Sequence, residues 1–264
     1  MGNGRHVSAV GLFLLWLGYT IVSIGMWRIV PTIAGWDVVP YVDLAATAES
    51  LVQNVTIAQG ITAGLVVLLV IVLGWKTAVL KDNLPTPRWL LAVPIIVAVV
   101  ALATTDWSNL SDKGGSYVLA LAITTLFIGI SEETMFRGVF VVGVRRLEQT
   151  ETSVWFWSSL AFAFIHAGNA FVGGGAGVGV QVVLAFFGGT LFYITRRATG
   201  TLIVPILLHG LWDFSTFSHT GDLRAISNLS SQVLIVTGIL LFVVVLIKRH
   251  DWADTPVTDS AYPA

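Results

Sequence analysis

Apolar runs long enough to cross a bilayer recur along the whole chain and limit it to a membrane-embedded fold. A spanning helix needs about 20 predominantly apolar residues. About eight runs meet this requirement, at about 7–29, 58–78, 88–105, 116–146, 153–170, 176–196, 201–218 and 231–248. The 264 residues are 55% hydrophobic and only 11% charged, whereas a soluble domain carries about 25% charged residues. The sequence therefore predicts an all-α polytopic membrane protein.

The positions of Lys and Arg predict the orientation of these spans. With a cytoplasmic N-terminus, ten basic residues fall in cytoplasmic segments and only Arg28, Lys113 and Arg224 fall outside, while Arg137 lies within a span. Cytoplasmic loops carry such an excess of positive charge. We therefore expect both termini in the cytoplasm and a multi-pass protein of the cell (plasma) membrane.

One membrane-embedded helical domain is expected over residues 1–250, with its motif-bearing core at 116–218. The polar tail at 251–264 is expected to be disordered. The first apolar run is too long for a cleaved signal sequence, so we interpret it as a retained first helix. The run at 116–146 exceeds the usual span length and is expected to extend beyond the bilayer or to bend.

Two connecting segments carry no motif that we can assign to chemistry. The loop at 30–57 contains Pro31 and Pro40, which break helices, and it is interpreted as a solvated connector with at most a short surface helix. Gly175 and Gly179 are spaced four residues apart, which suits close helix packing or a flexible loop.

Composition excludes several classes of site and partner. The absence of cysteine removes disulfides, thiolate zinc sites and cysteine nucleophiles. A net charge of −1 and the lack of a basic patch give no indication of a nucleic-acid partner. The expected partners are the lipid bilayer and a membrane-tethered peptide or protein, and the sequence does not address the oligomeric state.

Three ionisable side chains lie inside the fourth apolar run. A charge at the centre of a bilayer costs about 2.5–3.5 kcal/mol or more, so these groups must face a protein interior, water or one another. Glu133 and Arg137 are four residues apart, share a helix face and can pair. Glu132 points about 100° away, which leaves it available as a general base. The alternative is that both acids share Arg137 in a buried structural network.

Further polar residues are expected at the same depth. His166 and His209 lie within apolar runs, and Asp213 shares a helix face with His209, where it either orients the imidazole or acts directly. At 1.5 Å per residue, Glu132, His166 and Asp213 lie about 20 Å from the cytoplasmic helix ends and His209 about 14 Å. Convergent polar groups of this kind predict an active site.

The chemistry of this set suits hydrolysis. Glu132 would activate a water molecule, and His209 with its neighbours would stabilise the oxyanion. Alternatively, Glu132, His166, His209 and Asp213 would hold a divalent metal such as Zn, with one open position. No other cofactor is expected.

Other intramembrane protease signatures are absent or poorly placed. No histidine begins a His-Glu-x-x-His helix, and no Gly-x-Gly-Asp sequence occurs. Gly129-Ile130-Ser131 has the Gly-x-Ser form of rhomboid proteases, but a lone short motif is a weak indication. Ser131 is therefore not expected to be a nucleophile.

Three motifs occur in order on three predicted helices. Together they resemble the CPBP family, the CAAX prenyl protease-like and bacteriocin-processing intramembrane endopeptidases, also called the ABI family. The resemblance covers about residues 116–218 and extends to the eight-helix plan. The motifs are Glu132-Glu133-x-x-x-Arg137, Phe162-x-x-x-His166 and His209-x-x-x-Asp213.

The resemblance implies a role for each motif position. Glu132 would be the catalytic glutamate that activates water, with Glu133 and Arg137 completing its motif. His166 would take part in water or proton handling. His209 would position water or stabilise the oxyanion.

Asp213 departs from the Asn that the family often has at this position. Asn donates a hydrogen bond to an oxyanion, whereas an ionised Asp repels one. Asp213 must therefore be protonated, orient His209 or bind a metal, and the resemblance leaves metal dependence open.

The sequence thus predicts an intramembrane endopeptidase, either glutamate-dependent or a metalloenzyme. Its substrate would be membrane-associated, either of the prenylated CAAX type or leader-bearing. Two other classes stay open. One is a non-catalytic membrane interaction or immunity protein. The other is a proton-coupled transporter, because intramembrane Glu and His also build proton relays.

Overall fold

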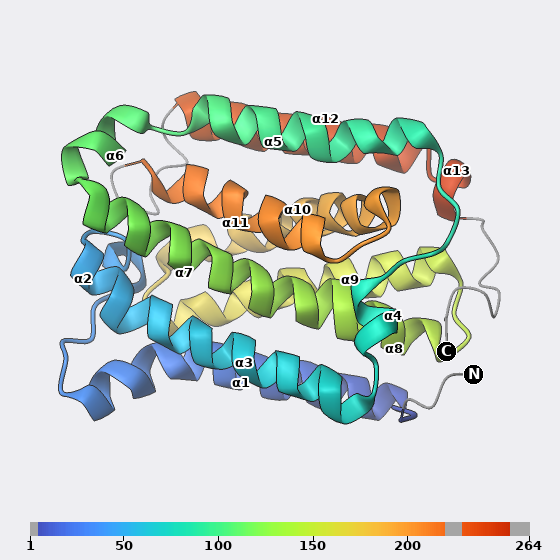
Figure 1. Ribbon diagram of the computed structural model, residues 1–264, viewed down its shortest axis with the longest axis horizontal. Coiled ribbons are helices and arrows are strands. Elements are labelled where there is room, and N and C mark those ends of the chain that lie inside the picture. The colour runs from blue at the N-terminus through green and yellow to red at the C-terminus, as the bar shows by residue number, and fades with distance from the viewer. Residues whose placement is uncertain (1–4, 220–228, 254–264) are drawn as a thin grey trace.

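The computed structural model describes residues 5–219 and 229–253, and its regular elements in these ranges are helices, of which the long ones run roughly along one direction (Figure 1). The predicted all-α fold is confirmed. The predicted tail falls almost wholly outside the described residues. In chain order the elements are α1 (Ala9–Ala34), η1 (Tyr41–Asp43), α2 (Ala48–Leu51), η2 (Val52–Thr56), α3 (Ile57–Leu73), α4 (Lys76–Leu80), η3 (Arg88–Leu91), α5 (Ala92–Thr104), α6 (Trp107–Lys113), α7 (Gly115–Glu133), η4 (Thr134–Phe140), α8 (Val141–Arg145), α9 (Glu151–Ile165), η5 (His166–Val172), η6 (Gly175–Gly177), α10 (Val178–Thr199), α11 (Ile203–Phe217), α12 (Leu229–Ile247) and α13 (His250–Ala253).

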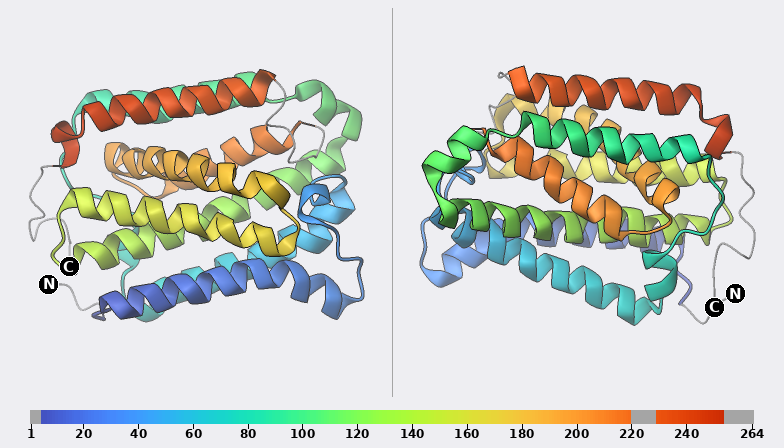
Figure 2. Two further views of the ribbon diagram at one scale, coloured as in Figure 1. Left: turned by 180° about the vertical axis from the view of Figure 1, so that it is seen from behind. Right: turned by 45° about the horizontal axis from the view of Figure 1, so that its top comes forward.

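The helices stack in layers, with α5 and α12 on one outer side and α1 and α3 on the other (Figures 1 and 2). The helices that carry the three motifs, α7, α9 and α11, lie between these layers together with α10. Large apolar side chains on the outer helices face outward, such as Leu14, Ile71, Ile95 and Leu240. The apolar surface suits lipid, and the motifs lie in the interior.

Each of the eight predicted runs contains a helix in the structure. Among the described residues, four helical stretches are long and apolar enough to cross a membrane, or five if one bent pair forms a single span. The helix α11 and the apolar part of α12 are shorter. The protein is thus an integral membrane protein, and the count of eight spans stays a prediction. The four stretches are Ala9–Ala34, Ala48–Leu73, Gly115–Arg145 and Val178–Thr199, and the bent pair is Arg88–Thr104 with Trp107–Lys113.

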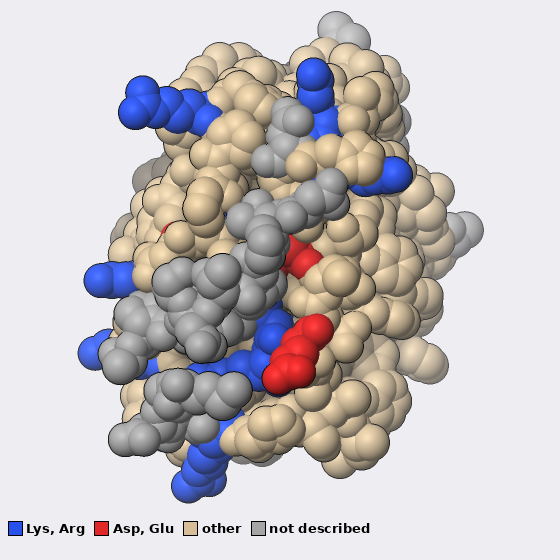
Figure 3. All heavy atoms as spheres, turned by 90° about the vertical axis from the view of Figure 1, so that its right-hand side faces the viewer, with Lys and Arg blue, Asp and Glu red and all other residues tan. Residues whose placement is uncertain are grey.

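Basic side chains gather at one end of the molecule, where α1 begins and α8 ends (Figures 1 and 3). A buried ionic network, which we call the basic-end network, connects the segments at this end. The Asp82 carboxylate lies 2.8 Å from Nη1 of Arg145 and 3.4 Å from Nε of Arg196. The Glu151 carboxylate lies 3.0 Å from Nη1 of Arg197 and also pairs with Arg145. The network joins the loop after α4 to α8, α9 and α10.

The interpretation of the 30–57 loop as a solvated connector is wrong. The helix α1 continues through Pro31 to Ala34 and ends at Gly35, whose φ is +72°. Beyond it, Tyr41, Leu44 and Ala45 are buried. These side chains are apolar or aromatic, and they fold back onto the bundle because that removes their surface from water.

Close helix packing, one of the two uses predicted for Gly175 and Gly179, does not occur at either residue. A Cβ atom at either residue would have no heavy atom within 4 Å. Gly175 instead adopts φ of +62°, a conformation that glycine takes without steric cost.

The long fourth run is a continuous helical stretch with a widened turn. Residues Thr134–Phe140 form a π-helical segment directly after Glu133. Such single π turns inside α-helices are frequent at functional sites.

Two glycines set the distance between α7 and α11. A Cβ on Gly129 would lie 2.5 Å from the carbonyl oxygen of Ile206, and one on Gly210 would lie 3.2 Å from that of Thr125. No larger residue fits at Gly129 without a backbone shift. The close crossing brings the first motif, on α7, against the third, on α11.

Candidate active site

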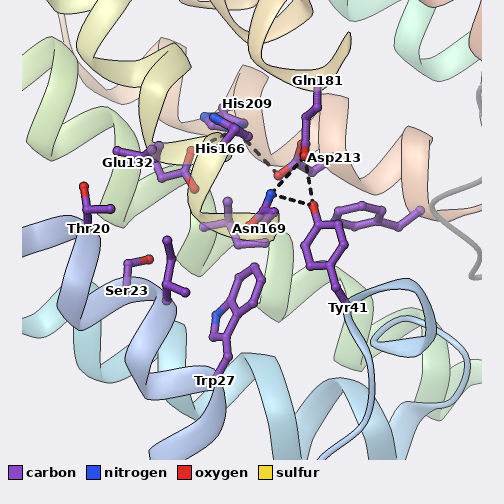
Figure 4. Close-up of a pocket in the computed structure, with 14 residues that line it drawn as sticks. Thr20, Ser23, Trp27, Tyr41, Glu132, His166, Asn169, Gln181, His209 and Asp213 are labelled. Atoms are coloured by element: carbon purple, nitrogen blue, oxygen red, sulfur yellow. Dashed lines mark hydrogen bonds and ion pairs between the residues drawn. The ribbon is translucent and has the colours of Figure 1, made fainter. Parts of the chain in front are cut away.

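A cavity of about 90 Å³ lies between the motif helices and the loop after α1 (Figure 4). This volume has room for several water molecules. The structure brings all four predicted residues to its wall, from α7, η5 and α11. They are Glu132, His166, His209 and Asp213.

The predicted ion pair between Glu133 and Arg137 is present. Oε1 of Glu133 lies 2.9 Å from Nη1 of Arg137, and both side chains are fully buried. The guanidinium also lies 4.0 Å from the ring centroid of Phe162, a favourable cation–π arrangement. Gly189 makes room for it, since a Cβ there would lie 3.0 Å from Nη2 of Arg137. The first two motifs therefore hold each other in place.

Glu132 faces the cavity with an unused oxygen. Its Oε2 has no hydrogen-bond partner among the described residues. The nearest basic nitrogen is Nε2 of His209, at 3.9 Å. The pairing of Glu133 with Arg137 thus leaves Glu132 available, as the spacing predicted.

His209 is oriented by Glu133. Its Nδ1 lies 2.8 Å from Oε1 of Glu133, and because an ionised carboxylate only accepts, Nδ1 carries the proton. The ring stacks on Phe192 with centroids 4.6 Å apart. Nε2 then faces Glu132 and lies 3.6 Å from Oδ2 of Asp213. The sequence did not predict that Glu133 would fix this ring, because the contact joins two helices.

His166 presents one nitrogen to the cavity. Its Nδ1 donates to the carbonyl oxygen of Phe162 at 2.9 Å. A carbonyl only accepts, so Nδ1 carries the proton and Nε2 is left as an acceptor. His166 is the first residue after α9, and it can accept a proton or orient a water molecule.

Sequence reasoning missed the opposite wall. Tyr41, Asn169 and Gln181 form a closed triangle of hydrogen bonds, and Trp27 stacks on Tyr41 with centroids 5.7 Å apart. All four line the cavity. The available signal was weak: Asn169 and Gln181 are uncharged polar residues near apolar runs, and Asn169 follows His166 by three positions.

Ser131 does not line the cavity. Its hydroxyl lies 3.1 Å from both Oε1 of Gln59 and the carbonyl oxygen of Ile128. The residue is fully buried. Its contacts are structural, in line with the expectation that it is not a nucleophile.

Binding of a metal by the four predicted ligands, which line one cavity, stays a prediction. Among the described residues, no three His, Asp or Glu side chains are grouped so that they could hold an ion. Nδ1 of His209 is bonded to Glu133 and Nδ1 of His166 to a carbonyl, so Nε2 of each ring stays available as a ligand. The mechanism proposed for this site uses the side chains alone.

Comparison with known protein families gives a match that covers the three motifs. Residues 114–215 match the model of the family described as Rce1-like, type II CAAX prenyl endopeptidase. The match spans all three motifs and confirms the resemblance that the sequence predicted. Neither the curated proteins nor the solved structures contain a match. The match indicates an intramembrane protease that acts on a membrane-associated substrate.

Proposed function

From the Rce1-like match over residues 114–215, we propose that this protein is an intramembrane endopeptidase in which Glu132 activates water. The observation that carries the proposal is the free Oε2 of Glu132 in a cavity that has room for water. Four of the polar groups that line this cavity come from the three motifs. A carboxylate with no counterion and a water beside it is the arrangement that general-base hydrolysis needs.

In the proposed reaction Glu132 both accepts and returns the proton. A water molecule gives a proton to the carboxylate, and its oxygen bonds to the carbonyl carbon of the scissile peptide. The carbonyl oxygen takes the negative charge. When the C–N bond breaks, the proton held by Glu132 passes to the leaving nitrogen, and the carboxylate is regenerated.

The other motif residues support this step. Glu133 holds His209 so that Nε2 points toward Glu132, where it contacts the water or the oxyanion. Arg137 neutralises Glu133, so the charge of Glu133 does not compete for the proton. His166 offers an acceptor nitrogen to a water molecule in the same cavity.

The substrate we propose is a peptide held at the membrane by a lipid or an apolar segment. The cavity lies inside a bundle whose outer surface is apolar, so a peptide tethered to the bilayer is concentrated beside it. A prenylated C-terminal CAAX peptide and a leader-bearing precursor share this property.

Replacement of Glu132 by Gln tests the mechanism. The protein is purified, placed in liposomes and given two fluorogenic peptides of one sequence, one farnesylated at a C-terminal CAAX and one tethered by an apolar segment. Cleavage by the wild-type protein and its loss in the variant are expected. Glu49→Gln is the matched control, since Glu49 is exposed and does not line the cavity. Undiminished cleavage by Glu132→Gln contradicts the mechanism.

The same samples separate the alternatives. An interaction or immunity protein would bind a peptide equally in both forms and cleave it in neither. A proton-coupled transporter would move protons or a solute across the liposome without cleavage.

We further propose eight spans with both termini in the cytoplasm of the cell membrane. The absence of native cysteine makes single introduced cysteines a clean probe. Gln149→Cys and Ser111→Cys occupy exposed positions in the α8–α9 loop and in α6. In intact cells a membrane-impermeant thiol reagent should label the second and not the first, and the reverse pattern would invert the topology.

A further inference from the structure

The hydroxyl group of Tyr41 has a donor that no described residue uses. Its oxygen accepts a hydrogen bond from Nδ2 of Asn169 at 3.1 Å and another from Nε2 of Gln181 at 2.9 Å. A tyrosine hydroxyl has two acceptor sites and one proton to donate. Both acceptor sites are filled, so the O–H bond must point elsewhere.

The surroundings hold the ring in one orientation. The two amides are joined to each other at 3.0 Å, and the Tyr41 ring stacks on Trp27 at an interplanar angle of 18°. Gly173, whose Cα faces this turn, has a φ of +96°, a conformation that glycine adopts without steric cost. Such fixed donors stabilise charge without reorganisation during a reaction.

The hydroxyl faces the reacting groups across the cavity. Figure 4 shows Tyr41 and Asp213 on one side of the cavity, Glu132 on the other, and Asn169 between them. Burial raises the pKa of the Tyr41 hydroxyl above its usual value, and the charges of Asp213 and Glu132 raise it further, although the bond from Gln181 opposes this. Tyr41 therefore keeps its proton at neutral pH.

A hydrolytic site needs a donor where the carbonyl oxygen becomes an oxyanion. Ionised Asp213 and Glu132 only accept hydrogen bonds. We propose that the Tyr41 hydroxyl donates a hydrogen bond to this oxygen, so that Tyr41 is a catalytic residue and Asn169 and Gln181 position it. The inference rests on the proposed function and assigns the donor that Asp213 does not provide.

Tyr41→Phe removes the hydroxyl and keeps the ring. With the farnesylated CAAX peptide in liposomes, kcat is expected to fall about 100- to 1000-fold, as on loss of an oxyanion donor, while KM stays within about threefold. Tyr117→Phe is the matched control. Its hydroxyl donates to the carbonyl oxygen of Ala45, in the same loop, at 2.9 Å, and Tyr117 does not line the cavity.

A second change distinguishes a catalytic role from a structural one. Asp213→Asn introduces an amide donor beside the cavity, so it should restore part of the kcat that Tyr41→Phe loses. A merely structural role for Tyr41 predicts no such rescue. If Tyr41→Phe does not fold, Gln181→Met removes one of the bonds that aim the hydroxyl, and kcat should fall with little change in KM.

The outcomes separate the two proposals. If the wild-type protein cleaves neither peptide, the proposed function and this inference both fail. If cleavage requires Glu132 but Tyr41→Phe matches Tyr117→Phe in kcat, only the role of Tyr41 is overturned. An unchanged kcat in Gln181→Met overturns it in the same way.

Discussion

Replacement of Glu133 by Gln is expected to destabilise the bundle strongly, because it leaves a cation in the interior without its counterion. The Arg137 side chain is fully buried, and its Nη1 makes its hydrogen bond to Glu133. Its Nε and Nη2 have no hydrogen-bond partner among the described residues. Gln retains an acceptor oxygen of similar shape, so the change removes mainly the charge.

The expected loss is about 3 kcal/mol in the free energy of unfolding. Removal of one partner from a buried ion pair costs about 3–5 kcal/mol, and the lower end applies because the acceptor oxygen remains. Replacement of both partners by uncharged residues of similar volume is often neutral. The double variant Glu133→Gln with Arg137→Met should therefore recover most of the loss.

Equilibrium unfolding in mixed detergent micelles measures this quantity for the wild-type protein, both single variants and the double variant. Glu49→Gln is again the control, since the exposed Glu49 bonds only to Gln53 within its own helical segment. The reasoning is refuted if Glu133→Gln unfolds within about 1 kcal/mol of the wild type, or if the double variant is less stable than Glu133→Gln alone.

Four further outcomes are expected. Asp213→Asn should keep kcat within about tenfold, because an amide can donate to an oxyanion and Glu133, rather than Asp213, bonds Nδ1 of His209. A larger loss would give Asp213 a direct role. Burial opposes ionisation of Asp82, but the surrounding arginines outweigh it and hold its pKa below the ordinary 3.8. The contribution of Asp82 to stability should be complete above about pH 4 and should disappear as the pH falls through the lowered pKa. The melting temperature of the wild-type protein should therefore drop at acidic pH, and Asp82→Asn should lack this drop. Gly129→Val should displace α11, because a Cβ would lie 2.5 Å from the carbonyl of Ile206, so both stability and cleavage should fall. Dialysis against a chelator should leave cleavage intact, because the carboxylate of Glu132 can take the proton from water without an ion; a loss that Zn²⁺ reverses would show that a metal takes part.

Contacts within one helix were predictable from sequence spacing. The four-residue separation of Glu133 and Arg137 predicted a pair that the structure shows at 2.9 Å. The same separation put Asp213 near His209, at 3.6 Å. Helix geometry fixes both distances before any tertiary contact forms.

Contacts between helices were not predictable in this way. The bond from His209 to Glu133 depends on how closely α7 and α11 approach, and Gly129 sets that approach. The π turn after Glu133 likewise has no periodic signature in the sequence. The position of a residue along its helix axis could be counted from residue numbers. The direction in which its side chain points around that axis could not.

Tyr41 illustrates the limit most clearly. It lies in a short helical turn directly after Pro40, where neither helical nor strand periodicity assigns a face. Its place in the cavity follows from the triangle with Asn169 and Gln181, which are distant in sequence. Loops of this kind often carry functional residues on a rigid scaffold.

The basic-end network also limits the order in which parts of the chain can fold during synthesis. Asp82 is made early, but the arginines it meets belong to α8 and α10, more than 60 residues later at Arg145 and more than 110 later at Arg196. Until α10 emerges from the ribosome, the Asp82 carboxylate and the Arg145 guanidinium cannot both be fully surrounded. The early helices are therefore expected to form a partly open intermediate in which these charged groups are not yet paired. A chain truncated before α10 would expose those groups to the quality-control proteases of the cell.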